Sequence, residues 1–404
     1  MVNFQFLSGL NTIGANIIDI QSNSGRIIFD YGEIFDSNLG RLPEWEDSIE
    51  NTAIFISHLH IDHIGSLDQV PAEVPIYMSV DSYRLYQWLI EIEEEQAIQA
   101  TVYPLNYNEI KTVGDIQVFF KKSDHDIEGA CAIFVQTPDV KLINSGDVRL
   151  SGNFPENVNK WMEEGNKFKP DIFLLEGTSF SFEEEDEIEK EVTEKEMYDK
   201  WQNLLKENQQ EIIFINPYIR DITRVYNLST ITQMNGRKIV LEPKYAYLLE
   251  KYHKSLDFFV LKELDRKQYF KKNWISLEEI QKDPKKYVLQ NTFENRMFMK
   301  MFEKGVYCHS NGEPLGDYDV RYQNLVSTIE DHNFTFKDFN VSGHATQEDI
   351  VAIAKEVDAK ITIPWHSFKP EKLMESLMAA GLSTFLPEKD TIYSLNRLNK
   401  NVVG

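Results

Sequence analysis

His58-Leu59-His60-Ile61-Asp62-His63 is the stretch of this 404-residue chain that decides which folds and sites we consider. It directly follows the apolar run at residues 53–57 (AIFIS), which predicts a buried strand. Imidazole nitrogen and carboxylate oxygen suit zinc and similar divalent ions. Four such groups in one short loop do not fit around one tetrahedral ion, so the spacing favours two neighbouring ions that share the loop. A surface loop that is rich in histidine by chance is the alternative, but the whole chain holds only nine histidines.

The same order, a short apolar run closed by an acid or a histidine, recurs along the chain. It is seen at residues 25–30 (GRIIFD), 141–147 (KLINSGD), 171–176 (DIFLLE) and 361–366 (ITIPWH), and His125 follows the run at 117–120. Each run predicts a buried strand. Because the chemistry gathers where strands end, we expect a packed sheet whose loops carry the site. Helices are predicted at residues 81–95 and 347–357, the second with Thr346 as its N-cap.

The middle of the chain has a sequence pattern that is typical of a separate domain. A dense acidic run at residues 183–196 is typical of a solvated helix face or loop. Two further strands are predicted at 211–216 and 237–241, with a helix-length segment between them. We therefore expect an α/β domain at 181–340 that is inserted into a first domain formed by residues 1–180 and 341–404.

Composition excludes several classes of protein. The chain has 42 Lys and Arg against 65 Asp and Glu, a net charge of −23, which argues against sequence-blind binding to nucleic acid but not against a metal-loaded cleft. Its 42% hydrophobic content excludes wholesale disorder. The two cysteines, Cys131 and Cys308, form no CxxC motif, which excludes thiolate zinc fingers and fits a reducing compartment. No signal peptide or membrane-spanning helix is expected, so we predict a cytoplasmic protein.

Together these motifs resemble the metallo-β-lactamase superfamily, specifically its β-CASP branch of nucleases, and most closely ribonuclease J. Along nearly the whole chain, the matching positions are Asp30 for the first motif, residues 58–63 (HLHIDH) for the second, His125 for the third, Asp147 in SGDVR for the fourth, Glu176 in LLEGTSF for motif A, His344 in VSGHATQED for motif B and His366 in IPWHS for motif C. Residues 310–314 (SNGEP) also resemble a ribonuclease J segment that precedes motif B.

The resemblance implies a fold and a ligand set. The first domain would be an αββα sandwich of the metallo-β-lactamase type, with the α/β β-CASP domain inserted into it. The first of two divalent ions would be held by His58, His60 and His125, and the second by Asp62, His63 and His366. Asp147 would bridge both ions, and Asp30 would orient a histidine ligand from behind. Zinc is the first expectation for the metal, with manganese as the alternative.

The resemblance also implies an activity. The protein would be a two-metal-ion phosphodiesterase, a ribonuclease with 5′-to-3′ exonuclease and/or endonuclease activity that uses a hydroxide bridging the two ions. Catalytic roles would fall to Asp62, Glu176 and His344. His344 would protonate the leaving oxygen or bind phosphate, and Glu176 would orient His344 or a metal ligand. Ser310, His344 and Thr346 match a pocket for a 5′-terminal phosphate, so single-stranded RNA with a 5′-monophosphate is the expected partner.

The chain departs from the ribonuclease J pattern in ways that keep alternatives open. Asp126 and Glu128 stand where serine and proline are usual, and these extra carboxylates would either repel an anionic substrate or recruit more metal. Ribonuclease J carries a further C-terminal domain that aids assembly, so the oligomeric state is open, with a homodimer as one expectation. Arg220, Arg224, Arg237 and Lys238 form a basic stretch that would either contact RNA or serve solubility.

Two other functions compete with a ribonuclease. The first is a metal-dependent nuclease or phosphodiesterase that acts on single-stranded DNA, short oligonucleotides or a nucleotide messenger; the acidic surface favours it. The second is a non-catalytic β-CASP scaffold, which the complete ligand set disfavours, because degenerate members of the branch lose ligands.

Overall fold

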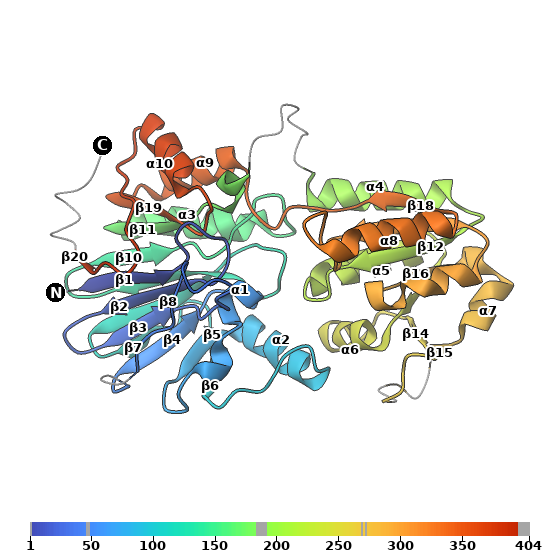
Figure 1. Ribbon diagram of the computed structural model, residues 1–404, viewed down its shortest axis with the longest axis horizontal. Coiled ribbons are helices and arrows are strands. Elements are labelled where there is room, and N and C mark those ends of the chain that lie inside the picture. Colours follow the sequence, from blue (N-terminus) through green and yellow to red (C-terminus); the bar gives the residue numbers. More distant parts are fainter. Residues whose placement is uncertain (1, 46–48, 183–191, 268–269, 271–272, 395–404) are drawn as a thin grey trace. The chain divides into compact units, whose positions relative to one another are not determined.

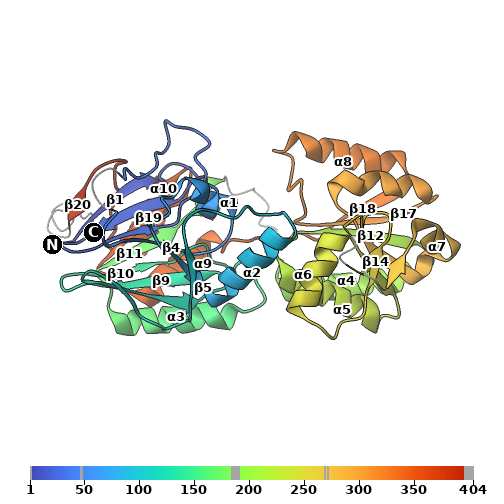
Figure 2. The ribbon, with the colours of Figure 1, turned by 90° about the horizontal axis from the view of Figure 1, so that it is seen from below.

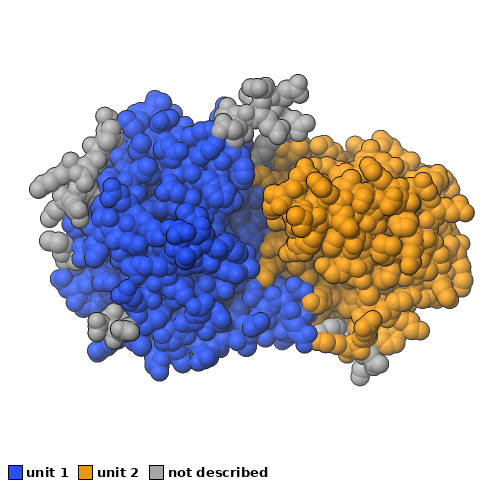
Figure 3. Space-filling view, viewed as in Figure 1, with its two compact units in different colours: residues 1–190, 343–404 blue, residues 191–342 orange. Residues whose placement is uncertain are grey.

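The computed structural model describes residues 2–45, 49–182, 192–267, 270 and 273–394. The chain divides into two compact units, the first formed by residues 1–190 and 343–404 and the second by residues 191–342 (Figure 3). The second unit is expected to start at position 181 and starts at 191 by this division. Phe180 and Ser181 belong to the first unit, since Phe180 lies in its core and Ser181 Oγ lies 3.2 Å from Ser367 Oγ. Residues 183–191 of the acidic run lie outside the described residues.

The first unit is built on two sheets (Figure 1). One sheet has the strand order β20 (Tyr393–Ser394), β1 (Asn3–Ser8), β2 (Ile17–Gln21), β3 (Arg26–Phe29), β4 (Thr52–Ile56), β5 (Ile76–Ser79) and β6 (Val102–Leu105). The other has the order β19 (Ile361–Trp365), β11 (Ile172–Glu176), β10 (Lys141–Asn144), β9 (Cys131–Gln136), β8 (Ile116–Lys122) and β7 (Lys111–Val113).

The inner faces of the two sheets share one hydrophobic core, because side chains alternate between the faces of a strand. Phe4 and Phe55 from the first sheet and Ile133 from the second belong to this core. Phe134, the next residue along β9, points the other way and belongs to a second core under the outer helices. The two sheets therefore form a sandwich.

Helices cover the outer faces. The helical elements of this unit are α1 (Ile61–Ile64), η1 (Leu67–Gln69), α2 (Val80–Glu91), α3 (Pro155–Phe168), η2 (Thr178–Ser181), α9 (Gln347–Val357) and α10 (Pro370–Ala379). Trp161 of α3, Ile350 of α9 and Leu373 of α10 pack on the outer face of the second sheet. α2 lies beside β5 and β6 of the first sheet (Figure 2). The mixed α/β fold class is confirmed, with the layer order αββα.

Five strands of the sandwich end beside a residue that the sequence singled out. β3, β4, β11 and β19 match their predicted runs to within one residue at each end, and β10 ends three residues before Asp147, the acid that closes its run. β3 and β4 pair in parallel, and β10, β11 and β19 are likewise parallel neighbours. Parallel neighbours end at the same edge of a sheet, so their C-terminal loops gather in space.

The second unit contains one parallel sheet that is buried on both faces. Its strand order is β15 (Trp274–Ile275), β14 (Phe259–Leu261), β13 (Lys238–Leu241), β16 (Tyr287–Gln290), β12 (Ile212–Pro217), β17 (Gly305–Ser310) and β18 (Phe334–Asp338). Its helical elements are α4 (Glu194–Glu207), α5 (Ile222–Met234), α6 (Pro243–Tyr252), α7 (Leu277–Lys282), η3 (Pro284–Lys286), η4 (Phe293–Met301) and α8 (Val320–Asp331).

The central strand β12 shows why both faces are apolar. Ile213 and Ile215 join the core under α4, α5 and α6, whereas Ile212 and Phe214 join the opposite core, which includes α8. Figure 2 shows these helices on the two sides of the sheet. A parallel sheet covered on both faces reads as a continuous apolar run, as residues 212–215 (IIFI) do.

Two of the basic residues considered for RNA contact are structural. Arg224 is fully buried, and its guanidinium pairs with the Glu194 carboxylate on α4. Arg237 donates to the backbone oxygens of Asn208 and Glu211. The expectation of a basic patch is therefore wrong at these two positions, because both guanidinium groups are used inside the unit. Within the described chain, no helix is both long and apolar enough to cross a membrane.

Candidate metal centre

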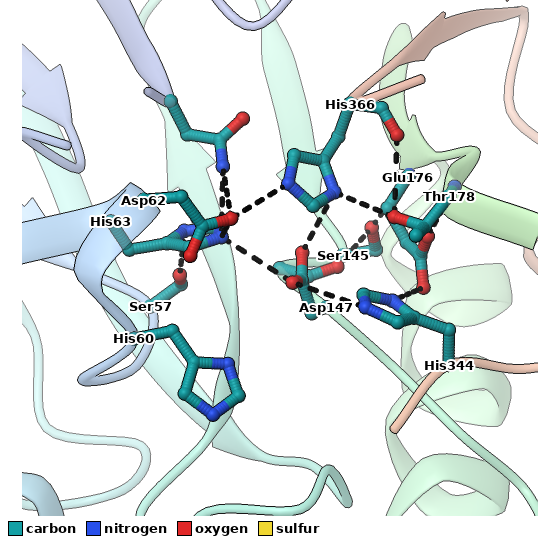
Figure 4. A network of polar contacts seen from close by, with 12 residues as sticks. Ser57, His60, Asp62, His63, Ser145, Asp147, Glu176, Thr178, His344 and His366 are labelled. Carbon is teal, nitrogen blue, oxygen red and sulfur yellow. Dashed lines mark hydrogen bonds and ion pairs between the residues drawn. The ribbon is translucent and has the colours of Figure 1, made fainter. Parts of the chain in front are cut away.

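The site begins where β4 ends. Ser57 and His58 follow the last residue of β4 and are fully buried, and His60 is the N-cap of the short helix α1. Asp62 and His63 lie in the first turn of α1, so the loop and the helix together hold four potential ligands, of which Figure 4 labels His60, Asp62 and His63.

The first group of ligand atoms comes from His58, His60, His125 and Asp147, all within 4.8 Å of one another. His60 Nδ1 lies 3.1 Å from both His58 Nε2 and His125 Nε2. Asp147 Oδ2 lies 3.6 Å from His58 Nε2 and 3.8 Å from His125 Nε2. His125 and Asp147 are contributed by the loops after β8 and β10.

The second group comes from Asp62, His63, Asp147 and His366. His63 Nε2 lies 3.4 Å from Asp62 Oδ2 and 3.4 Å from Asp147 Oδ2. His366, directly after β19, places Nε2 3.0 Å from Asp62 Oδ2 and Nδ1 3.4 Å from Asp147 Oδ1. Asp147 is common to both groups, so the structure brings all seven predicted ligands together.

The spacing within both groups fits a divalent cation. Ligand atoms about 2.0–2.2 Å from a tetrahedral ion lie about 3.3–3.6 Å from each other, close to the separations of 3.0–3.8 Å seen here. Asp147 Oδ1 is buried and accepts no hydrogen bond. A buried carboxylate oxygen without a donor is costly unless a cation balances it. The His and Asp cluster is therefore compatible with a divalent metal site.

The electrostatics keep His58 and Asp147 in the forms that bind metal, whereas His63 must give up a proton to bind an ion. Burial lowers the pKa of His63, but the carboxylates of Asp147, Asp62 and Asp30 raise it more, well above its usual range. Burial lowers the pKa of His58, and His63 lowers it further, so His58 keeps a free lone pair. Burial alone would raise the pKa of Asp147, but the nearby His366, His63 and His58 hold it well below its usual range. An ionised carboxylate and a neutral imidazole are the states that metal binding requires.

Residues behind the ligands contact the second ring nitrogen of three imidazoles and so orient these rings. Asp30, which is fully buried, places Oδ2 2.9 Å from His63 Nδ1 and accepts a hydrogen bond from Ser57 N at 2.7 Å. Ser57 Oγ lies 3.0 Å from His58 Nδ1. Thr178 Oγ1 lies 2.8 Å from His366 Nδ1. Such contacts fix the ring and its tautomer, so that the other nitrogen faces the ion.

Glu176 and His344 form a pair beside the cluster. His344 Nδ1 lies 3.0 Å from Glu176 Oε1, and the carboxylate also accepts from Val148 N and Thr178 N. Burial lowers the pKa of His344, but the Glu176 carboxylate raises it more, to about 9. His344 Nε2 lies 4.0 Å from Asp147 Oδ2, so this imidazole faces the place where both groups meet (Figure 4).

Two predicted phosphate-binding residues have other contacts. Thr346 caps α9 by accepting a hydrogen bond from Asp349 N at 3.1 Å, which leaves the hydroxyl hydrogen free to donate. Ser310 lies in the second unit, is fully buried, and its Oγ donates to Phe339 O at 3.2 Å.

Asn16 belongs to the site, although nothing in the sequence around it indicates this. Its Nδ2 lies 2.8 Å from His63 Nε2 and 3.4 Å from Asp62 Oδ2, and its backbone N–H donates to Asp62 O. Asn16 directly precedes β2, and a single amide in an unremarkable loop carries no signal of metal chemistry. Only its fully buried polar side chain marks it once the fold is known.

Comparison with known proteins finds relatives that are named ribonuclease J. No protein-family model matches it. It is 24% identical to ribonuclease J of Mycoplasma genitalium, over 98% of this chain and 75% of that protein. It is 23% identical to ribonuclease J of Mycoplasma pneumoniae, over 89% of this chain and 66% of that protein. The chain is ribonuclease J-like.

Two further comparisons bear on this ribonuclease J-like chain. Ribonuclease J of Pyrococcus abyssi is 24% identical to it, over 59% of this chain and 58% of that protein. The crystal structure of a protein of unknown function from Enterococcus faecalis V583 matches with a TM-score of 0.84 and 25% identity, over 97% of this chain and 99% of the other. The whole chain, with its insertion, therefore has a counterpart of the same fold.

Proposed function

We propose that this protein is a metal-dependent phosphodiesterase that hydrolyses RNA. The observation that carries the proposal is the pair of ligand groups that share Asp147, next to the Glu176–His344 pair. RNA is the substrate we infer because the curated relatives are named ribonuclease J. Two ions, with zinc before manganese, match the number and type of the ligands.

His58, His60 and His125 would hold one ion, Asp62, His63 and His366 the other, and Asp147 both. Divalent ions bound there would activate water and offset the charge that builds on the phosphodiester oxygens. The carboxylates of Asp62 and Asp147 are ionised, so they would offset the positive charge of the bound ions. Asp30 would fix the orientation of the His63 ring.

His344 would act on the phosphate or the leaving oxygen. Glu176 accepts from Nδ1, so the Nε2–H of a protonated ring points away from Glu176 and can donate to a phosphate oxygen or transfer a proton. Glu176 is thus a positioning residue for His344 in this proposal. Its own carboxylate is held by two backbone N–H groups.

The proposal extends to the RNA end that is recognised, the type of the inserted domain, the location of the protein and its oligomeric state. We infer a preference for single-stranded RNA with a 5′-monophosphate, with His344 and Thr346, at the N-terminus of α9, as contacts to that phosphate. The expected contact from Ser310 is not part of the proposal, because its buried hydroxyl donates to Phe339 O. We also propose that the inserted unit is a β-CASP domain, that the protein is cytoplasmic and that it forms a homodimer. Exonuclease and endonuclease cleavage both fit this proposal.

A degradation assay tests the function. One RNA with a 5′-monophosphate, the same RNA with a 5′-hydroxyl and the matching single-stranded DNA are incubated with the protein in zinc or manganese, with a chelator control. We expect metal-dependent loss of RNA and faster loss of the monophosphate form. Loss of DNA alone, or of no polymer by protein that holds two ions, would contradict the proposal.

The net charge of −23 gives the second candidate a specific basis, because a strongly acidic protein attracts long polyanions poorly. That candidate is a phosphodiesterase for short oligonucleotides or a nucleotide messenger. Hydrolysis of dinucleotides with intact long RNA would favour it.

A further inference from the structure

The imidazoles of the metal centre share a pattern on the side that faces away from the proposed ions. His58 has Ser57 Oγ there, His63 has Asp30 Oδ2, His125 Nδ1 has the backbone oxygen of Gly343, and His366 has Thr178 Oγ1. His60 is oriented differently, since its Nδ1 faces the other ligand atoms and its Nε2 faces away. A partner for His60 Nε2 would complete the pattern.

Asp126 stands in that place. Its Oδ1 lies 3.4 Å from His60 Nε2 and 3.2 Å from His125 Nε2. The 3.4 Å separation is an ion-pair contact and does not have the geometry of a hydrogen bond. When Nδ1 binds an ion, His60 carries its hydrogen on Nε2, and a small turn of the ring would let Asp126 Oδ1 accept it. The acid lies directly after His125, where the sequence departs from the ribonuclease J pattern.

The position of Asp126 is fixed by its surroundings. Gly343 packs against it so closely that a Cβ added to Gly343 would lie 2.9 Å from Asp126 Oδ2. The backbone oxygen of Gly343 also accepts from His125 Nδ1. The loop after β8 and the loop before α9 therefore hold the carboxylate between the His60 ring and the Gly343 backbone.

We propose that Asp126 is a positioning residue that accepts the Nε2 hydrogen of His60 and thereby strengthens the first metal site of this chain. The inference rests on the metal centre of the proposed function. A carboxylate behind an imidazole fixes its tautomer and makes its other nitrogen a stronger donor to a divalent ion, and loss of such a partner typically costs about 10–100-fold in metal affinity.

Two variants and a control test this role by metal binding alone. Asp126→Ala removes the acceptor, and Asp126→Asn keeps an acceptor oxygen without the charge. Glu128→Gln removes the same charge two residues away, where the Glu128 carboxylate lies 3.8 Å from Lys122 Nζ. Each metal-free protein is titrated with Zn²⁺ against a chromophoric chelator, and the His366→Ala variant identifies the step that belongs to the second group.

We expect the step of the first group to weaken about 10–100-fold in Asp126→Ala and less in Asp126→Asn. The second step, and both steps of Glu128→Gln, should match the unsubstituted protein. The visible spectrum of Co²⁺ in the first site should change in Asp126→Ala but not in Glu128→Gln. Thermal unfolding of the metal-free proteins checks that each variant is folded.

Unchanged affinity in folded Asp126→Ala would overturn the role of Asp126. An equal loss in Glu128→Gln and Asp126→Asn would also overturn it, because the effect would then be one of overall charge. If the unsubstituted protein binds no divalent ion, the proposed function fails instead, and the two failures are thereby told apart.

Discussion

Asp147 is the residue on which both ligand groups depend. Its Oδ2 faces His58, His63 and His125, and its Oδ1 faces His366. It reaches this position because it follows β10 in the centre of the second sheet, after Gly146 with a φ of +56°. A left-handed turn at that point favours glycine, since a side chain there would be strained.

The first prediction concerns Asp147→Asn. The variant keeps the shape of the side chain but removes the charge that both ions would share, so RNA hydrolysis should fall at least about 10²-fold and neither ion should bind tightly. Metal content by elemental analysis and RNA cleavage check this. Glu163→Gln, at an exposed position on α3, is the matched control, and full activity with two ions in Asp147→Asn would contradict the bridge.

The second prediction separates His344 from the ligands. His344→Ala should lower kcat about 10²–10⁴-fold and leave two ions bound, because the imidazole is proposed to contact phosphate or the leaving oxygen. Glu176→Gln should lower kcat in the same direction, since it weakens the contact with His344 Nδ1. If either variant loses an ion, the role assigned to this pair is wrong.

At the scale of elements, most positions of strands and helices could be predicted from the sequence. The run at 53–57 appears as β4 (Thr52–Ile56), and the helix at 347–357 appears as α9 with the same bounds. Apolar runs and caps are local signals, so they need no knowledge of the rest of the chain. The helix expected at 81–95 ends at Glu91 in the structure.

Contacts between residues that lie far apart in the sequence could not be predicted. Asn16 meets His63, and Asp126 meets His60, through pairing between loops that lie 47 and 66 positions apart. Neither contact leaves a periodic pattern. The buried position of Arg224 could not be predicted for the same reason, because its partner Glu194 lies 30 positions away on α4.

The third prediction tests that buried pair between α4 and α5. Arg224→Ala leaves Glu194 buried and without its cation, and the loss of one partner of such a pair costs about 3–5 kcal/mol of unfolding free energy. Urea unfolding measures the loss. Arg220→Ala, which removes the same charge from a partly exposed neighbour, should cost far less; equal costs would contradict the importance of burial.

The fourth prediction concerns Glu242, the N-cap residue of α6. Burial raises its pKa from 4.5 to about 7, despite hydrogen bonds from Thr292 and Asn295. Between these pH values the unfolded chain loses the proton and the folded chain keeps it, so this group lowers stability by up to about 3 kcal/mol as pH rises from 4.5 past 7.

Glu242→Gln should therefore flatten the fall of unfolding free energy between pH 5 and pH 8, measured by urea unfolding. Glu250→Gln, at an exposed position on the same helix, should leave the slope unchanged. An unaltered slope in Glu242→Gln would show that Glu242 does not titrate in this range.

At the scale of the whole molecule, the net charge affects how the protein meets a polyanion, whereas the candidate ligands affect only the charge at the site. The net charge of −23 weakens contact with any polyanion, whereas divalent ions would place positive charge only at the site. The fold class and the gathering of the candidate ligands into one cluster could be predicted because these residues stand at strand ends in a fixed order. The ends of the inserted unit depend on which residues pack into which core.

The fifth prediction is that metal removal destabilises the protein. Ions that bind the folded chain alone stabilise it by about 2.7 kcal/mol when present at 100 times their dissociation constant. Chelation should lower Tm, and the loss should be restored by Zn²⁺ or Mn²⁺. A Tm that does not depend on metal in the unsubstituted protein would contradict a tightly held centre.

The most direct test of a two-ion ribonuclease is to titrate metal-free protein with Zn²⁺ or Mn²⁺ and to follow RNA cleavage at each addition. We expect no cleavage without metal and a rise in cleavage that stops at two ions per chain. Full cleavage by metal-free protein, or a rise that stops at one ion, would contradict it.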